Sequence, residues 1–566
     1  MKKNGEHVVF GMTSLYDGIV QQAERYGDKP RYIYKVNKQE KTFSFRDMKD
    51  HVDVIAAGLA SLDMAGKFVG VTGETHPDYV AAYLATVSAG GVIVPLDKDI
   101  LNEQFVGFCK RCDIAVLFYT RAMHQKMLDT APELPDVKYF IGFDLPEDAE
   151  MPERFMRFEA FFEIGKKAYE DGVRPAETTE QDPEKLCTIL FTSGTTGTSK
   201  GVMLNQRNLV TSALDSCHIM ATNDKDFFVS VLPIHHAYEF TCAQLALPNC
   251  GATTYINDSI KNTMRNFVKV KPRSLVLVPL YIETMHKRIW AEIEKKGKTE
   301  QVKAAIKVSN GLRKVGVDLR RVFFKDILAA FGGEIRYIVC GGAPLRPELI
   351  DEFEAFGISI FEGYGITECA PLVSANPMHW RKHRSAGQTV EHMEARIDKA
   401  DPEDTTGEIV VHGDAVMMGY YKNPEATAEV FTEDGWFRTG DIGYIDDDNF
   451  IFITGRKKNI ILLSNGKNVF PEELEEYLNA SDSVCEGVVI GRKNEETGEI
   501  AITALVYPNG EKFAGMTREE IYPIIKDEIT EINKKLPAFK HITELELRDE
   551  EFEKTTSRKI MRYKLK

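Results

Sequence analysis

A run of small hydroxyl residues and glycines with one lysine is the stretch of this chain best suited to chemistry. In order, the run consists of Thr192, Ser193, Gly194, Thr195, Thr196, Gly197, Thr198, Ser199, Lys200 and Gly201. Glycines let the main chain curl so that successive N–H groups point at one anion, and the hydroxyls add further donors. Lys200 contributes a full positive charge. The run therefore predicts a loop that wraps a polyphosphate.

Two other interpretations of this run are less favourable. The nucleotide motif G-x-x-x-x-G-K-[ST] is absent, because Lys200 follows Gly197 by three positions and precedes Gly201. This spacing argues against a P-loop kinase or GTPase. A flexible linker would have a similar composition, but linkers lie between polar segments, whereas apolar runs flank this stretch on both sides.

Further polar segments follow predicted strands, where ligands of parallel sheets collect. The pair His235-His236 follows a strand expected over 226–232, and Gly341-Gly342-Ala343 follows one expected over 336–340. A third strand, over 358–361, precedes the segment 362–368. The histidine pair lacks a nearby third ligand for a metal, and Gly363-x-Gly365 lacks the third glycine of a dinucleotide fingerprint. Neither a metal centre nor NAD binding is favoured.

Taken in order, these motifs resemble those of the adenylate-forming (ANL) superfamily, which includes acyl-CoA synthetases, luciferases and the adenylation domains of peptide synthetases. The matching patterns are T-S-G-T-T-G-T-S-K-G at 192–201, L-P-x-x-H at 232–236, Y-G-x-T-E at 364–368, R-T-G-D at 438–441 and K-T-x-x-G-K-I at 554–560. The variant H-H-A-Y-E-F and a helical insertion before residue 336 look most like the long-chain fatty acyl-CoA synthetase branch. The resemblance covers nearly the whole chain from about residue 13.

The resemblance implies that ATP, Mg²⁺ and coenzyme A act here. Lys559 and Thr367 would stabilise the α-phosphate during adenylation. Lys200 would face the departing pyrophosphate. His236 would lie beside the acyl carboxylate and the entry path of the thiol. Glu368 would hold Mg²⁺, because a carboxylate cannot approach a polyanion until charge is neutralised. The remaining nucleotide contacts of this half would come from Thr192, Ser193, Gly194, Thr195, Thr196, Gly197, Gly341, Gly342, Ala343, Glu362, Gly363, Tyr364 (stacked on adenine) and Gly365.

The C-terminal part carries the other implied contacts. Asp441 would accept from both ribose hydroxyls, since a carboxylate offers two acceptor oxygens, and Arg456 would reach the ribose and phosphate. Lys458 lies at the family's hinge position. The pantetheine arm of coenzyme A would contact Ser464, Asn465 and Gly466. One departure stands next to the catalytic lysine: Arg558 replaces the glycine of the family pattern.

The elements that position these residues alternate between strand and helix, which predicts an α/β fold with helices on both sides of a parallel sheet. Ser44 and Asp47 form a capping-box pattern that opens a helix with an apolar face. We expect a large N-terminal domain over 1–455, with mixed or parallel sheets between helices and a β-rich subdomain. A small, mobile α+β domain carrying the catalytic lysine is expected over 456–566.

The composition of the chain indicates which partners it can bind and in which compartment it works. The formal charge of −15 over 566 residues argues against nucleic-acid binding. Cys109 and Cys112 form a lone C-x-x-C pair, for which packing is expected rather than zinc. No signal peptide is apparent, and the apolar run 79–96 is broken by 88–91 into a helix and a strand. We expect a cytoplasmic monomer or homodimer with at most a peripheral membrane contact.

The predicted function is ATP-dependent activation of a fatty, long-chain carboxylic acid to acyl-AMP, followed by transfer to coenzyme A. Three alternatives stay open. First, the acceptor thiol could belong to an acyl carrier protein. Second, Arg558 leaves open a non-catalytic nucleotide-binding regulator. Third, bile, aromatic or medium-chain acids also fit the motifs. A helix containing Met285, Ile289 and Trp290 could line an acyl tunnel or belong to the core.

Overall fold

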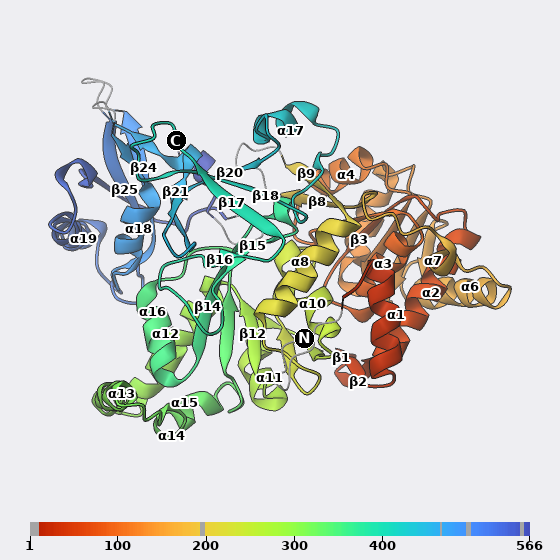
Figure 1. The fold of residues 1–566 in the computed structure, drawn as a ribbon, viewed down its shortest axis with the longest axis horizontal. Coiled ribbons are helices and arrows are strands. Elements are labelled where there is room, and N and C mark those ends of the chain that lie inside the picture. Colours follow the sequence, from red (N-terminus) through yellow and green to blue (C-terminus); the bar gives the residue numbers. More distant parts are fainter. Residues whose placement is uncertain (1–10, 193–198, 464–466, 494–499, 555–559, 566) are drawn as a thin grey trace. The chain divides into compact units, whose positions relative to one another are not determined.

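The computed structural model describes residues 11–192, 199–463, 467–493, 500–554 and 560–565, and they form two compact units (Figure 1). The first unit runs over Met1–Thr192, Lys200–Glu394 and Gly413–Ala428, and the second mainly over Ala395–His412 and Glu429–Lys566. The predicted loop residues Ser193, Gly194, Thr195, Thr196 and Gly197 lie outside the described residues, as do Ser464, Asn465, Gly466 and Lys559.

The first unit contains an eight-stranded mixed sheet. Its strands, in spatial order, are β19 (Gly419–Tyr420), β9 (Lys200–Asn205), β8 (Leu186–Thr192), β4 (Val92–Leu96), β3 (Phe68–Thr72), β5 (Val116–Thr120), β6 (Tyr139–Phe143) and β7 (Phe155–Arg157). From β8 to β7 the pairing is parallel, whereas β9 is antiparallel to both of its neighbours. Strands β4 and β5 are buried along their whole length, as expected where helices cover both faces.

Helices of the first unit follow the sequence patterns closely. The predicted capping box is confirmed, because Ser44 accepts from the backbone of Asp47 at 3.0 Å and Asp47 accepts from that of Ser44 at 2.7 Å. The helices are α1 (Leu15–Tyr26), α2 (Phe45–Ser61), α3 (Pro77–Ser88), α4 (Asn102–Arg111), α5 (His124–Thr130), α6 (Phe158–Glu170), α7 (Pro175–Thr178), α8 (Gln206–Ile219), α9 (Ala237–Glu239), α10 (Ala246–Asn249), α11 (Thr263–Val270), α12 (Pro279–Lys295), α13 (Thr299–Lys314), α14 (Arg320–Phe323), α15 (Lys325–Ala329) and α16 (Pro347–Phe356).

Two further sheets complete the first unit. One has the order β10 (Phe227–Ser230), β11 (Thr253–Ile256), β1 (Pro30–Val36) and β2 (Gln39–Ser44), and the other β12 (Ser274–Leu277), β13 (Tyr337–Cys340), β14 (Ser359–Gly365), β15 (Leu372–Ala375) and β16 (Gln388–Thr389). The expected end of the 358–361 strand was wrong. β14 pairs parallel with β13 up to Glu362, then antiparallel with β15 from Gly363, and this change of partner extends it to Gly365.

Helix α12 packs as part of the hydrophobic core. Met285 and Ile289 of α12 are buried in a cluster built around β12 and β13, and Trp290 packs against it. The charged stretch that follows is divided among α13, α14 and α15. Of the two roles left open for α12, the structure therefore supports the core role, since none of the three residues lines the pocket described below.

The second unit contains smaller sheets and shorter helical segments. Its strands are β17 (Met393–Asp398), β18 (Gly407–Gly413), β20 (Phe437–Ile445) and β21 (Ile451–Arg456) in one sheet, β22 (Ile461–Leu462) and β23 (Asn468–Val469) in a second, and β24 (Val484–Lys493), β25 (Ile500–Pro508) and β26 (Glu544–Leu547) in a third. Helix α17 (Pro424–Val430) spans the sequence boundary of the units, and α18 (Pro471–Asn479) and α19 (Arg518–Asn533) belong to the second. The acidic residues 446–448 form the connection of the β20–β21 hairpin.

The folded structure shows where the C-x-x-C pair lies and how apolar the helices are. Cys109 and Cys112 are both buried in the core beneath α4, which confirms the packing role. Among the helices in the described ranges, none combines the length and the apolar character needed to cross a bilayer.

Candidate functional site

The ends of the predicted phosphate loop are held by a β-hairpin. Thr192 at the end of β8 is the register partner of Lys200 at the start of β9, and the Thr192 hydroxyl donates to the Lys200 carbonyl at 3.4 Å. Short apolar runs on both sides of the loop form these strands. A hairpin fixes both ends of the loop that the sequence predicts to wrap phosphate.

Tyr420 joins two of the predicted site residues in the first unit. Its hydroxyl donates to Oε1 of Glu368 at 2.9 Å, and the Lys200 ammonium lies 4.6 Å from the centroid of its ring. Burial, followed by the neighbouring Glu368 carboxylate, raises the pKa of Tyr420, so its hydroxyl stays protonated. The ring can thus hold a cation on its face and a carboxylate at its tip.

The backbone explains why Tyr420 reaches both residues. Strand β19 pairs with β9, placing Tyr420 opposite Val202, and the N–H of Tyr421 donates to the Gly201 carbonyl at 2.8 Å. The N–H of Met417 donates to the Glu368 carbonyl at 2.8 Å. The segment 417–421 therefore forms backbone hydrogen bonds both to β9 and to the Y-G-x-T-E segment.

The glycine segment that follows β13 lies beside the glycine segment at the C-terminal end of β14. Cys340 and Glu362 are register partners in parallel strands, so Gly341 and Gly363 come next at the same edge. A Cβ on Gly341 would lie 3.2 Å from the Tyr238 ring, and one on Gly365 would lie 2.4 Å from the Pro371 carbonyl oxygen. The backbone contact explains why glycine occupies position 365, whereas at Gly341 the Tyr238 ring would have to shift by a few tenths of an ångström.

A pocket opens at this edge of the first unit. Five predicted site residues line it: Gly341, Gly342, Gly363, Tyr364 and Gly365. The other lining residues are mostly apolar: Ser216, Ile219, Met220, Tyr238, Cys242, Val276, Val339, Pro371, Leu372 and Ala375. The predicted residues Ala343, Glu362 and Thr367 do not line the pocket.

The histidine pair lies beside this pocket but does not line it. His236 precedes α9, whose Tyr238 forms part of the wall and donates to the carbonyl oxygen of Val339 at 3.1 Å. His235 is half-buried with Nε2 3.4 Å from Oδ2 of Asp97, and burial lowers the pKa of His235. The pKa shift favours a neutral imidazole at this position.

In the second unit, two predicted ribose contacts form an ion pair. Asp441 on β20 faces Arg456 on β21 across the hairpin, with Nε of Arg456 2.6 Å from Oδ1 of Asp441. The Asp441 carboxylate is almost fully buried, and such charge-assisted contacts fix its orientation. Lys458 follows in a short 3₁₀ turn, Lys457–Asn459, and is exposed.

Sequence reasoning missed several residues that the fold brings to these places. It gave no role to Tyr420, to Tyr238, or to the α8 residues Ser216 and Ile219. The helical pattern of α8 could have indicated that the last two share a face, but not what that face borders. The contact between Tyr420 and Glu368 joins residues 52 positions apart, and no local pattern announces it.

Two protein-family models together match most of the chain. Residues 19–421 match the AMP-binding enzyme family and residues 458–566 the AMP-binding enzyme C-terminal domain. Long-chain-fatty-acid–CoA ligase FadD15 of Mycobacterium bovis is 30% identical, with 82% of this chain and 77% of the relative covered.

Solved structures share the fold at lower identity. The anthranilate CoA ligase AuaEII in complex with anthranoyl-AMP superposes with a TM-score of 0.76 at 19% identity, covering 100% of this chain and 98% of that one. The A-PCP didomain of carboxylic acid reductase from Segniliparus rugosus, in complex with AMP, gives 0.78 at 21% identity, covering 98% and 81%. These matches confirm the predicted α/β fold with a small C-terminal domain.

Proposed function

The chain belongs to the AMP-binding enzyme family of adenylate-forming proteins, and we propose that it activates a long-chain fatty acid as acyl-AMP and transfers the acyl group to coenzyme A. The products are acyl-CoA, AMP and pyrophosphate. The observation that carries the proposal is the pocket at the ends of β13 and β14, where an apolar wall meets the glycine segments. The similarity to a long-chain-fatty-acid–CoA ligase supports the choice of acid.

The pocket suits a ligand with an apolar tail and a flat or polar head. Ile219, Met220 and Leu372 supply surface on which an alkyl chain loses contact with water, which stabilises binding by about 0.8 kcal/mol per buried CH₂. Gly341 and Gly363 line the pocket without a side chain, so an adenine ring in it would approach their backbone closely. We propose that Tyr364 stacks on that ring and that His236 stands beside the acyl carboxylate.

The phosphates are proposed to lie near the hairpin and the Tyr420 contacts. Lys200 would face the pyrophosphate, and Thr367 would donate to the α-phosphate. The Glu368 carboxylate has the oxygen donors that Mg²⁺ prefers, and its position is fixed by Tyr420, so it fits a metal ligand. When bound there, Mg²⁺ neutralises charge on the phosphates.

Residues of the C-terminal part complete the proposal. Asp441, held by Arg456, would accept from the ribose hydroxyls. Lys559 would stabilise the charge that develops at the α-phosphate in adenylation, while Ser464, Asn465 and Gly466 would contact the pantetheine arm in thioester formation. We propose 456–566 as the domain that alternates between the two steps, with Lys458 as its pivot.

The test is ATP–pyrophosphate exchange with purified chain across a graded series of carboxylic acids, from short to long alkyl chains with aromatic and bile acids included. We expect the highest kcat/KM for long-chain acids. Coenzyme A and a phosphopantetheine-bearing carrier protein are then offered as acceptors. If the thioester forms only on the carrier protein, the acceptor is that protein and not coenzyme A. If the chain binds nucleotide but releases no AMP when an acid is added, it is a regulator and not a ligase.

A further inference from the structure

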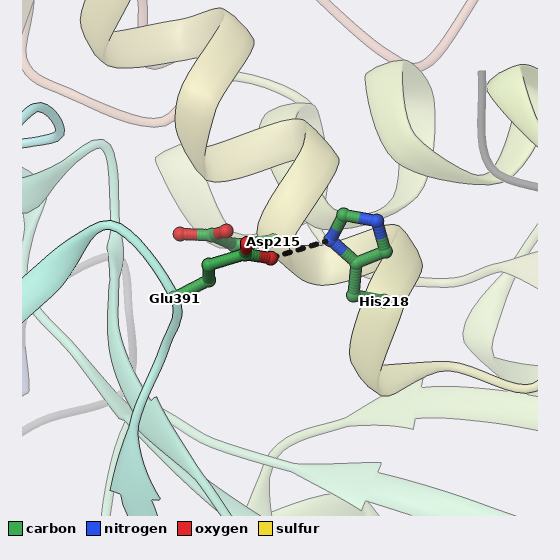
Figure 2. A group of neighbouring side chains, drawn as sticks. All are labelled: Asp215, His218 and Glu391. Carbon is green, nitrogen blue, oxygen red and sulfur yellow. Dashed lines mark ion pairs between the residues drawn. The ribbon is translucent and has the colours of Figure 1, made fainter. Parts of the chain in front are cut away.

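A cluster of two histidines and two carboxylates lies in the first unit, outside the site proposed above. Asp215 and His218 are three positions apart on α8 and therefore share one face of the helix. Glu391 and His392 come from the segment between β16 and β17. Figure 2 shows Asp215 and His218 on the helix with Glu391 approaching from the neighbouring segment. The cluster thus joins two parts of the unit that are distant in sequence.

The spacing of the side chains suits a small cation. One ligand atom from each of Asp215, His218 and Glu391 lies within 4.8 Å of the others, and Nδ1 of His218 is 3.6 Å from Oε2 of Glu391. Nitrogen and oxygen ligands about 2.0–2.2 Å from a tetrahedral Zn²⁺ stand roughly 3.3–3.6 Å apart. Because His218 and Glu391 are exposed, small rotations of these two side chains can close the remaining distance.

The buried carboxylate supplies a second, independent observation. Asp215 is 1% exposed, and its Oδ2 atom is buried without a hydrogen-bond partner among the described residues. Its other oxygen, Oδ1, is 2.8 Å from Nδ1 of His392. Burying a carboxylate oxygen without a partner is costly, and a cation at this oxygen would remove the cost.

We propose that Asp215, His218 and Glu391 bind a divalent transition-metal ion of the Zn²⁺ class, with His392 as the residue that orients Asp215. An imidazole nitrogen among the ligands favours such an ion over Mg²⁺, which prefers oxygen donors alone. The contact between His392 and Asp215 is the kind of second-layer hydrogen bond that fixes a metal ligand.

Occupancy of the site would anchor the C-terminal turn of α8. Ser216 and Ile219 of that turn line the pocket, whereas Asp215 and His218 face the cluster. An ion that ties α8 to Glu391 would therefore hold one wall of the pocket in place. The ion is proposed to be structural and takes no part in the reaction.

The test uses the full chain after chelator treatment, titrated with Zn²⁺ by calorimetry in millimolar Mg²⁺. We expect one Zn²⁺ equivalent that His218→Ala and Glu391→Ala each weaken at least tenfold, and that His392→Ala weakens by about 10–100-fold. The matched control is His383→Ala, at an exposed histidine that pairs with Asp351, and it should leave the isotherm unchanged.

A second measurement does not depend on variants. Co²⁺ substituted into the wild-type chain is expected to give visible d–d absorption bands that Zn²⁺ abolishes by competition. The proposal is overturned if the wild type has no Zn²⁺ equivalent that survives Mg²⁺, if Co²⁺ gives only the spectrum of the aqueous ion, or if folded His218→Ala binds Zn²⁺ as the wild type does.

Discussion

The Tyr420 hydroxyl donates a hydrogen bond to Oε1 of Glu368 at 2.9 Å, and the same tyrosine ring has the Lys200 ammonium 4.6 Å from its centroid. One aromatic side chain therefore touches a residue of the glycine-rich segment and a residue of the Y-G-x-T-E segment. Since both are proposed to act on the phosphates of ATP, Tyr420 is a positioning residue whose two contacts can be separated by mutation.

Tyr420→Phe keeps the ring beside Lys200 and removes only the hydroxyl. With Glu368 freed to rotate, we expect the Mg²⁺ concentration for half-maximal ATP–pyrophosphate exchange to rise by roughly tenfold. Mg²⁺ titrations of the initial rate measure this. Tyr444→Phe, at an exposed tyrosine of the second unit, is the control and should leave the titration unchanged. Identical Mg²⁺ curves for Tyr420→Phe and wild type would remove the proposed role.

Asp441→Asn breaks the charge pair with Arg456 and weakens one acceptor for the ribose. Hydrogen bonds to charged groups contribute about 1.5–3 kcal/mol, so we expect KM for ATP to rise by about 10–100-fold with KM for the acid unchanged. The matched control is Asp398→Asn, which breaks a second aspartate–arginine pair, with Arg438, in the same unit. A rise in both Michaelis constants would contradict a ribose-specific role.

Glu239 should make stability depend on pH. Burial raises the pKa of this fully buried carboxyl to about 7 in the folded chain, although Ser230 and Gln244 donate to its Oε1 at 2.5 and 2.7 Å. The folded chain then holds the proton more strongly than the unfolded chain, whose Glu pKa is near 4.3. The stabilising contribution is complete below that value and is lost as pH rises to about 7.

Glu239→Gln should remove this dependence. In urea unfolding at a series of pH values between about 4.5 and 7, the wild type is expected to lose on the order of 3 kcal/mol more stability than the variant, since the buried Glu475, whose pKa is also raised to about 7, titrates in both chains. Glu294→Gln, at an exposed position of α12, serves as the control and should follow the wild type. Parallel pH profiles for wild type and Glu239→Gln would show that burial does not hold the proton.

Lys559→Ala should separate the two half-reactions. Loss of a charge-matched donor at a developing charge costs on the order of a hundredfold or more, so acyl-AMP formation should fall at least that far. Thioester formation from supplied acyl-AMP should stay within a few-fold of wild type. Lys564→Ala, which removes an exposed lysine paired with Glu553 nearby in sequence, is the control. Equal loss in both assays would argue against the division of labour.

Local patterns predicted much of this fold, and contacts between distant segments account for what they missed. The capping box of Ser44 and Asp47 depends on residues three positions apart, so the sequence alone identifies it. Asp441 and Arg456 were both predicted to contact the ribose, and the β20–β21 hairpin places them opposite each other. By contrast, β14 extends to Gly365 because it changes partner from β13 to β15.

The candidate site likewise contains some residues that local patterns identify and others that depend on contacts between distant segments. Motif residues such as Gly341 and Gly363 were predicted, because small residues after a strand form a recognisable pattern. The pocket wall on α8 and the contact of Tyr420 with Glu368 depend on register between segments far apart, which no single stretch of sequence encodes.

Acid-dependent ATP–pyrophosphate exchange tests the central claim most directly. With purified wild-type chain, ATP, Mg²⁺ and labelled pyrophosphate, we predict that label enters ATP only when a fatty acid is added, and that Lys559→Ala abolishes this incorporation. If ATP binds yet no acid in the series, from short to long chain, supports exchange, the chain does not form an acyl adenylate and the proposed function is wrong.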